Sequence, residues 1–141
     1  MTEQENGCQL LPIGMRVSIK SGILASMNSA SPIRLLLSGE LSFGPGKAEL
    51  LEKIDGTGSI QLAAAEMGMS YMKAWKIVKG LNARFRDPVV ELSRGGNAKG
   101  GAILTPTGRE ILELYLEAVE LAERATHPKF QRMRELLAER E

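Results

Sequence analysis

The stretch SIQLAAAEMGMSYMKAWKIVKGLN, residues 59–82, predicts two short helices folded against each other across a glycine. Ser59 can accept the free N–H groups that open the first helix. Gly68 can end that helix because glycine adopts a positive φ at little cost, and Ser70 offers a second N-cap directly after it. Small alanines before the glycine would let the two helices cross closely. The pattern is typical of a helix-turn-helix.

Each of these helices has an apolar face at helical spacing. The first helix carries Ile60, Ala63, Ala64 and Met67 on one side. The second is predicted to run to about Asn82, with Tyr71, Ala74, Trp75, Ile77, Val78 and Leu81 on its apolar side. Its opposite side carries Met72, Lys73, Lys76, Lys79 and Gly80. One face therefore belongs to a core, with Trp75 assigned to packing, and the other is cationic.

The charge of the chain is unevenly distributed. The formal net charge is only +1, yet residues 70–99 carry seven basic and two acidic side chains, a net charge of +5. Residues 106–141 carry six basic and eight acidic side chains. The positive field is therefore local, which favours a nucleic-acid partner for this segment.

A β-hairpin is predicted after the second helix. Val89–Ser93 and Ala102–Thr105 have the composition of strands, and they flank the glycine-rich tip RGGNAKGG, residues 94–101. Such a tip permits a turn and lets backbone N–H groups approach a phosphate closely. It lacks the Gly-Lys-Ser/Thr ending of a Walker loop and opens no helix, so nucleotide binding is not predicted. The polar candidates on the tip are Arg94, Asn97 and Lys99.

The segment before the helix-turn-helix predicts a third helix. Ile33–Leu37 has the pattern of a strand, and Phe43–Gly46 has the composition of a turn. Lys47–Asp55 then places apolar residues on one helical face, and Gly56–Gly58 is expected to stop it. Two short helices cannot enclose a core alone, so this third helix completes a trihelical unit.

The first 31 residues are predicted to form a partly loose leader. Arg16–Lys20 alternates polar and apolar residues as a half-buried strand does, and Ser21–Ser31 is serine-rich like a loop. Cys8 is the single cysteine, which excludes an internal disulfide and a cysteine-based zinc site within one chain.

The tail predicts a long amphipathic helix that begins with Thr105 as N-cap and Pro106 in its first turn. His127-Pro128 is expected to interrupt it, because the residue before a proline is disfavoured in a helix, and one more helix follows to the end. The apolar stripe needs a partner, and we predict a homodimer through it. The candidate dimerisation residues are Ile111, Leu114, Tyr115, Ala118, Leu121 and Ala122.

The sequence predicts neither an enzyme nor a membrane protein. His127 is the single histidine, and no acid/base pair, metal cluster or activated nucleophile can be assembled, so no catalytic residue, metal or cofactor is expected. No apolar run approaches the ~20 residues that span a bilayer. The polar start MTEQENG lacks a signal-peptide pattern, and the predicted location is the cytoplasm.

Three segments together resemble the winged-helix domain of the molybdate-responsive ModE repressor family. They are GPGKAELLEKI (44–54), TGSIQLAAAEMGMSYMKAWKIVKGLN (57–82) and GGNAKGGAILTPTG (95–108), and the resemblance covers roughly Gly44 to Glu123. It implies a bacterial, homodimeric DNA-binding regulator whose helix near Ser70 enters the major groove, with the wing on backbone or minor groove. Full-length members carry molybdate-binding modules after this domain, whereas this chain ends at Glu141, so molybdate sensing is unsupported.

The predicted fold is therefore mainly α with a small β wing, a winged helix-turn-helix followed by a long C-terminal amphipathic helix. We divide it into a leader (1–31), a DNA-binding domain (32–105) and dimerisation helices (106–141). The predicted function is that of a transcriptional regulator binding a pseudo-palindromic operator in double-stranded DNA. The candidate DNA contacts are Ser70, Tyr71, Met72, Lys73, Lys76, Lys79, Arg94, Asn97 and Lys99.

An alternative is a winged-helix module that assembles proteins and has no specific DNA binding, since fold alone does not fix function. Salt dependence separates the two, because phosphate contacts make DNA affinity fall steeply with salt. The operator, the effector and the choice between activation and repression are not encoded in any pattern of the sequence.

Overall fold

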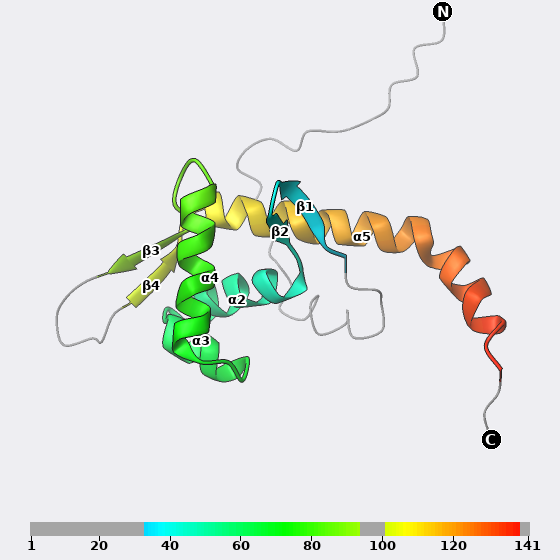
Figure 1. Ribbon diagram of the computed structural model, residues 1–141, viewed down its shortest axis with the longest axis horizontal. Coiled ribbons are helices and arrows are strands. Elements are labelled where there is room, and N and C mark those ends of the chain that lie inside the picture. Colours follow the sequence, from blue (N-terminus) through cyan, green and yellow to red (C-terminus); the bar gives the residue numbers. More distant parts are fainter. Residues whose placement is uncertain (1–32, 94–100, 139–141) are drawn as a thin grey trace, which may run out of the picture.

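A computed structural model describes residues 33–93 and 101–138. The order of elements is β1 (Leu35–Ser38), β2 (Leu41–Phe43), α2 (Pro45–Thr57), α3 (Ile60–Glu66), α4 (Tyr71–Arg84), β3 (Val90–Ser93), β4 (Gly101–Leu104) and α5 (Pro106–Glu135). This part of the chain is mainly helical, with a β-hairpin wing between α4 and α5, which confirms the predicted fold class (Figure 1). The predicted strand at Arg16–Lys20, the loop at Ser21–Ser31 and Cys8 lie outside the described residues.

The helix-turn-helix forms as its local signals predict. The Ser59 hydroxyl accepts a hydrogen bond from the Leu62 N–H at 3.3 Å, and the Ser70 hydroxyl accepts one from the Lys73 N–H at 3.2 Å. Gly68 between the helices has φ +64°, a conformation that glycine adopts without steric cost. Ala63 and Ala64 are fully buried, which allows α3 and α4 to pack closely.

Helix α2 is longer than expected at both ends. Phe43–Gly46 was predicted as a turn, but Gly44 is the N-cap and Pro45 is the first helical residue, where its missing N–H breaks no bond. Gly56 and Thr57 continue the helix. It ends at Gly58, whose φ is +67° and whose N–H donates to the Ile54 carbonyl at 2.8 Å.

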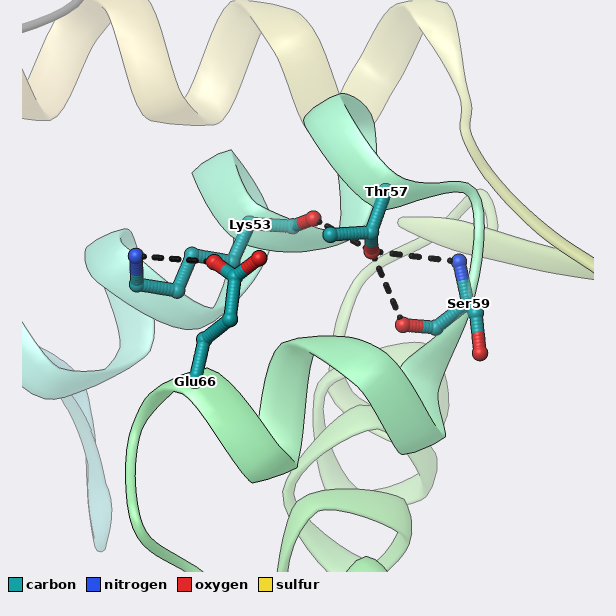
Figure 2. A network of polar contacts seen from close by, with 4 residues as sticks. All are labelled: Lys53, Thr57, Ser59 and Glu66. Atoms are coloured by element: carbon teal, nitrogen blue, oxygen red, sulfur yellow. Dashed lines mark hydrogen bonds and ion pairs between the residues drawn. The ribbon is translucent and has the colours of Figure 1, made fainter.

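A network of polar contacts joins α2 to α3 (Figure 2). The Lys53 ammonium donates to the Glu66 carboxylate at 3.1 Å, and this hydrogen bond raises the pKa of Lys53. The Thr57 hydroxyl donates to the Lys53 carbonyl at 2.7 Å and accepts from the Ser59 N–H at 3.3 Å. The turn that leads into α3 is thereby fixed to the last turn of α2.

Helix α5 is continuous through Pro128, so the expected break at His127-Pro128 is wrong. Proline lacks the N–H that would bond the carbonyl four residues earlier, but Pro128 is exposed, where water can satisfy that carbonyl. The loss is confined to one bond and bends the helix rather than ending it. The orange-to-red end of α5 bends away from the line of its first part (Figure 1).

The core lies where α2, α4, the wing and the first half of α5 meet. Tyr115 of α5 is 2% exposed, and its ring packs edge-on against Phe43 with 5.1 Å between centroids. Its hydroxyl donates to the Ile33 carbonyl at 2.8 Å, and burial raises the pKa of this phenol. Tyr115 therefore fastens the β1–β2 hairpin to α5. Other large buried residues include Leu50, Leu51, Ile54, Leu81, Leu112 and Val90.

Candidate nucleic-acid interface

The outer face of α4 is cationic and open to solvent, as predicted. Ala74, Val78 and Leu81 are buried, whereas Lys73, Lys76 and Lys79 are exposed. Within residues 33–93 and 101–138, neither the Lys73 nor the Lys76 ammonium forms an ion pair. Their positive charges are therefore available to an external anion.

The apolar and cationic faces of α4 meet along a line formed by Tyr71, Trp75 and Lys79. The Lys79 ammonium stands over the Trp75 ring, 4.8 Å from its centroid, in a cation–π contact. Trp75 is half-buried and packs against the core, in keeping with its expected packing role. The placement of Tyr71 on the apolar side is wrong, because its side chain is 48% exposed at the first turn, beyond the reach of the core.

The exposed N-terminal turn of α4 presents mixed chemistry. Met72 is 55% exposed beside Lys73. Ser70 is exposed too, and its hydroxyl is already engaged as the N-cap. Sulfur, phenol, ammonium and hydroxyl groups thus lie within one turn, a combination that can meet both base edges and phosphates.

The wing is held to the turn before α3 by a hydrogen bond from its second strand. Its strands pair antiparallel, with Val90 opposite Leu104 and Ser93 opposite Gly101. The Ala102 N–H donates to the Gly58 carbonyl at 2.8 Å, which ties β4 to the turn before α3. The candidate contacts on the tip, Arg94, Asn97 and Lys99, lie outside the described residues.

Asn82, in the last turns of α4, links that helix to the start of the wing by three hydrogen bonds. Its side-chain oxygen accepts from the N–H groups of Val89 and Val90 at 2.8 and 3.1 Å, and its amide donates to the Val90 carbonyl at 2.8 Å. This role of Asn82 is not predicted from the sequence, since no periodicity marks it. The one signal available is an asparagine seven residues before the strand predicted at Val89, since its side chain can bond the backbone as both donor and acceptor.

We expect Asn82→Ala to loosen the wing and to destabilise the protein by about 2–3 kcal/mol, because two buried backbone N–H groups lose their acceptor. Urea unfolding measures the loss, and amide hydrogen exchange of β3 shows whether it is local. Arg84→Ala, at an exposed position on the same turn of α4, serves as the control. Unchanged exchange in β3 of the alanine variant would contradict the linking role.

The candidate dimerisation residues on α5 fall into two groups. Leu114 and Leu121 are exposed by 59% and 66%, and they lie away from the core. Ile111, Ala118 and Ala122 are half-buried. Tyr115 points into the core of its own chain and is buried there. It is therefore not part of the surface that a second copy could contact.

Metal sites and membrane-spanning helices are two further features of interest in residues 33–93 and 101–138. No group of three or more histidine, cysteine, aspartate or glutamate side chains there is placed to hold a metal ion. No helix in the same residues is long and apolar enough to cross a membrane.

Comparison with known proteins supplies the family context. No protein-family model matches the chain. Over 93 residues, 66% of this chain, it is 32% identical to the DNA-binding transcriptional dual regulator ModE of Escherichia coli K12, covering 36% of that protein. The chain is homologous to the N-terminal region of the ModE regulators. It is also 36% identical over 83 residues to ModE of Yersinia pestis, 59% of this chain and 32% of that protein.

The ModE homology extends to a second group of relatives. The chain is 44% identical over 72 residues to the molybdenum-pterin-binding protein MopB of Rhodobacter capsulatus, which is 51% of this chain and 27% of MopB. The chain therefore spans about a third of the length of the ModE and MopB relatives. These relatives are named as regulators and binding proteins rather than as enzymes.

Proposed function

We propose that this ModE-like chain is a DNA-binding transcriptional regulator that acts in the bacterial cytoplasm as a homodimer on a pseudo-palindromic operator. The observation that carries the proposal is that Lys73 and Lys76, on the second helix of a helix-turn-helix, are exposed and form no ion pair within residues 33–93 and 101–138. This helix has its apolar side fixed in the core and a wing anchored to its end by Asn82. Homology to a named DNA-binding regulator agrees with this reading.

The N-terminal turn of α4 would supply sequence readout, because this is the part of the helix that such folds present to base edges. Lys73 suits a guanine edge, and the exposed Met72 suits a thymine methyl group. The exposed ring of Tyr71 brings its hydroxyl within reach of a phosphate, as does Ser70 at the helix start. The wing tip, with Arg94, Asn97 and Lys99, would add contacts to phosphates or a narrow minor groove.

The dimer would form along α5. Leu114, Ala118, Leu121 and Ala125 recur at i, i+4, i+7 and i+11, the spacing of a two-helix seam, with Ile111 at its start. Exposed leucines at two of these positions favour burial against a second copy. Two copies would place two α4 helices to meet two half-sites, which is why the operator is expected to be pseudo-palindromic.

Substitutions of Lys73 and Lys79 test the readout. We expect Lys73→Ala to relax sequence preference by about 1–3 kcal/mol, the value of a bidentate contact to a base. Lys79→Ala, farther along the helix and held over Trp75, is expected to lower affinity uniformly and to flatten the salt slope by about one unit. Binding to preferred and scrambled duplexes across a salt series measures both quantities.

Lys129→Ala, on the exposed far part of α5, is the charge-matched control and should change neither quantity. If Lys73→Ala and Lys79→Ala also change neither while the fold is intact, the cationic face of α4 does not contact DNA. If the chain then still binds another protein, with an affinity that does not depend on salt, the alternative of a protein-interaction module is favoured.

A further inference from the structure

A small pocket lies between α4 and the β1–β2 hairpin, on the flank of the cationic face. Its volume is about 200 Å³. This is below the about 300–1,000 Å³ of pockets that hold drug-sized ligands, so only a small group fits. The residues that line it are Glu40, Leu41, Lys47, Lys76, Ile77, Gly80, Leu81 and Arg84.

Three of these lining residues are cations and one is an acid. Lys47 donates to the Ser42 carbonyl, which fixes its ammonium beside the hairpin. Lys76 and Arg84 form no ion pair within residues 33–93 and 101–138. Glu40 likewise forms none there, and it offsets only one of the three charges. Mutual repulsion of the remaining positive charges is relieved when an anion enters.

Gly80 lines the pocket on the α4 side and leaves the helix surface open there. A Cβ added at Gly80 would meet nothing within 4 Å, and its φ is not positive. Glycine inside a helix is less favourable than alanine by about 1 kcal/mol. Alanine at this position would therefore leave the pocket open, whereas a long side chain would enter it.

We propose that this pocket is an oxyanion site that takes a phosphate group, either of a nucleic-acid backbone or as free inorganic phosphate. A phosphate matches the size of the pocket, and the guanidinium and ammonium groups are its usual partners. The nucleic-acid form of the proposal rests on the proposed function and extends the contact surface from α4 to Lys47. The free-phosphate form is independent of it.

Two pairs of variants test the site. Arg84→Gln removes a pocket cation, and Arg86→Gln removes the same charge two residues later, outside the pocket. Gly80→Glu fills the pocket with a carboxylate, whereas Gly80→Ala leaves it open. All three positions are exposed on or just after α4, and far-UV circular dichroism checks that the helices persist in the four variants.

The first measurement titrates each protein with inorganic phosphate at constant ionic strength and follows backbone amide signals by NMR. Saturable shifts confined to residues around Lys76–Arg84 are expected in the unmodified chain, in Arg86→Gln and in Gly80→Ala. They should be lost in Arg84→Gln and Gly80→Glu. The second measurement follows binding of a DNA duplex across a salt series. Loss of one phosphate contact should reduce the slope of log affinity against log salt concentration by about 0.9 in the two pocket variants, relative to their controls.

If the pocket variants lose the phosphate-induced shifts, the site takes free inorganic phosphate. If they flatten the salt dependence of duplex binding, the site takes a backbone phosphate. Either result supports the site. If phosphate produces no saturable shift and both pocket variants bind DNA as their controls do, the proposal is overturned. If the unmodified chain binds no duplex, the proposed function fails, and the phosphate titration alone then decides whether the pocket is an oxyanion site.

Discussion

Replacing Gly108 with alanine is expected to destabilise the protein by about 3 kcal/mol or more, as overpacking of a rigid site does. A Cβ at this position would lie 2.2 Å from the Val89 carbonyl oxygen and 2.7 Å from Leu104 Cδ1. The carbonyl cannot move freely, because it accepts hydrogen bonds from the N–H and the hydroxyl of Thr105, both at 3.0 Å. The first turn of α5 and the base of the wing would have to separate.

Urea unfolding of the Gly108→Ala variant measures this loss. Gly56→Ala is the matched control, since Gly56 is also helical, and a Cβ there would meet nothing within 4 Å. Alanine at Gly56 should leave stability unchanged or raise it by up to about 1 kcal/mol. Equal stability of the two variants would show that α5 does not lie this close to the wing.

Charged residues at Leu114 and Leu121 are expected to convert the proposed dimer to a monomer without unfolding the chain. Both side chains are exposed, so Leu114→Lys with Leu121→Lys leaves the core intact. A dimer binds a duplex with two half-sites about 10²–10⁴ more tightly than a single half-site, because its second contact is effectively intramolecular. A monomer loses this gain. Binding to a single half-site should change little.

Analytical ultracentrifugation at micromolar concentration reports the assembly state, and titration of one-site and two-site duplexes reports the affinity. His127→Lys with Gln131→Lys places the same charges on exposed positions farther along α5 and should remain dimeric. A stable monomer before any substitution, or unchanged assembly of the leucine variant, would contradict the dimer.

Local signals in the sequence predicted the helix-turn-helix well because its boundaries depend on nearby residues. Ser59, Gly68 and Ser70 act through their own backbone and the next turn, and Thr105 caps α5 in the same way, accepting from the Gly108 N–H at 3.0 Å. Such interactions span three or four residues and need no knowledge of the fold.

Features that depend on distant partners were less predictable. The apolar stripe of α5 is broad, and only the packing of Phe43 and Ile33 on Tyr115 decides that this residue faces inward while Leu114 faces outward. Tyr71 has the spacing of a core residue but lies beyond the edge of the core. The local rule that a proline ends a helix fails at Pro128, because an exposed position in a long helix tolerates one missing hydrogen bond.

The Asn82 link and the pocket beside Gly80 left no periodic signal at all. Asn82 bonds backbone groups seven and eight residues away, across the loop between α4 and β3. The pocket unites Lys47 with Lys76 and Arg84, which only the folded chain brings together. Polar contacts between elements of this kind follow from the tertiary arrangement rather than from pattern.

Selection of binding sites from random duplex DNA by the full chain tests the central claim most directly. A dimer that reads DNA through the N-terminal turn of α4 should enrich one motif made of two inverted half-sites, with centres about 10–10.5 base pairs apart or a multiple of this spacing. Recovery of such a motif is the predicted result. Recovery of random sequences, with no motif enriched over repeated rounds, would contradict the account of this chain as a sequence-specific regulator.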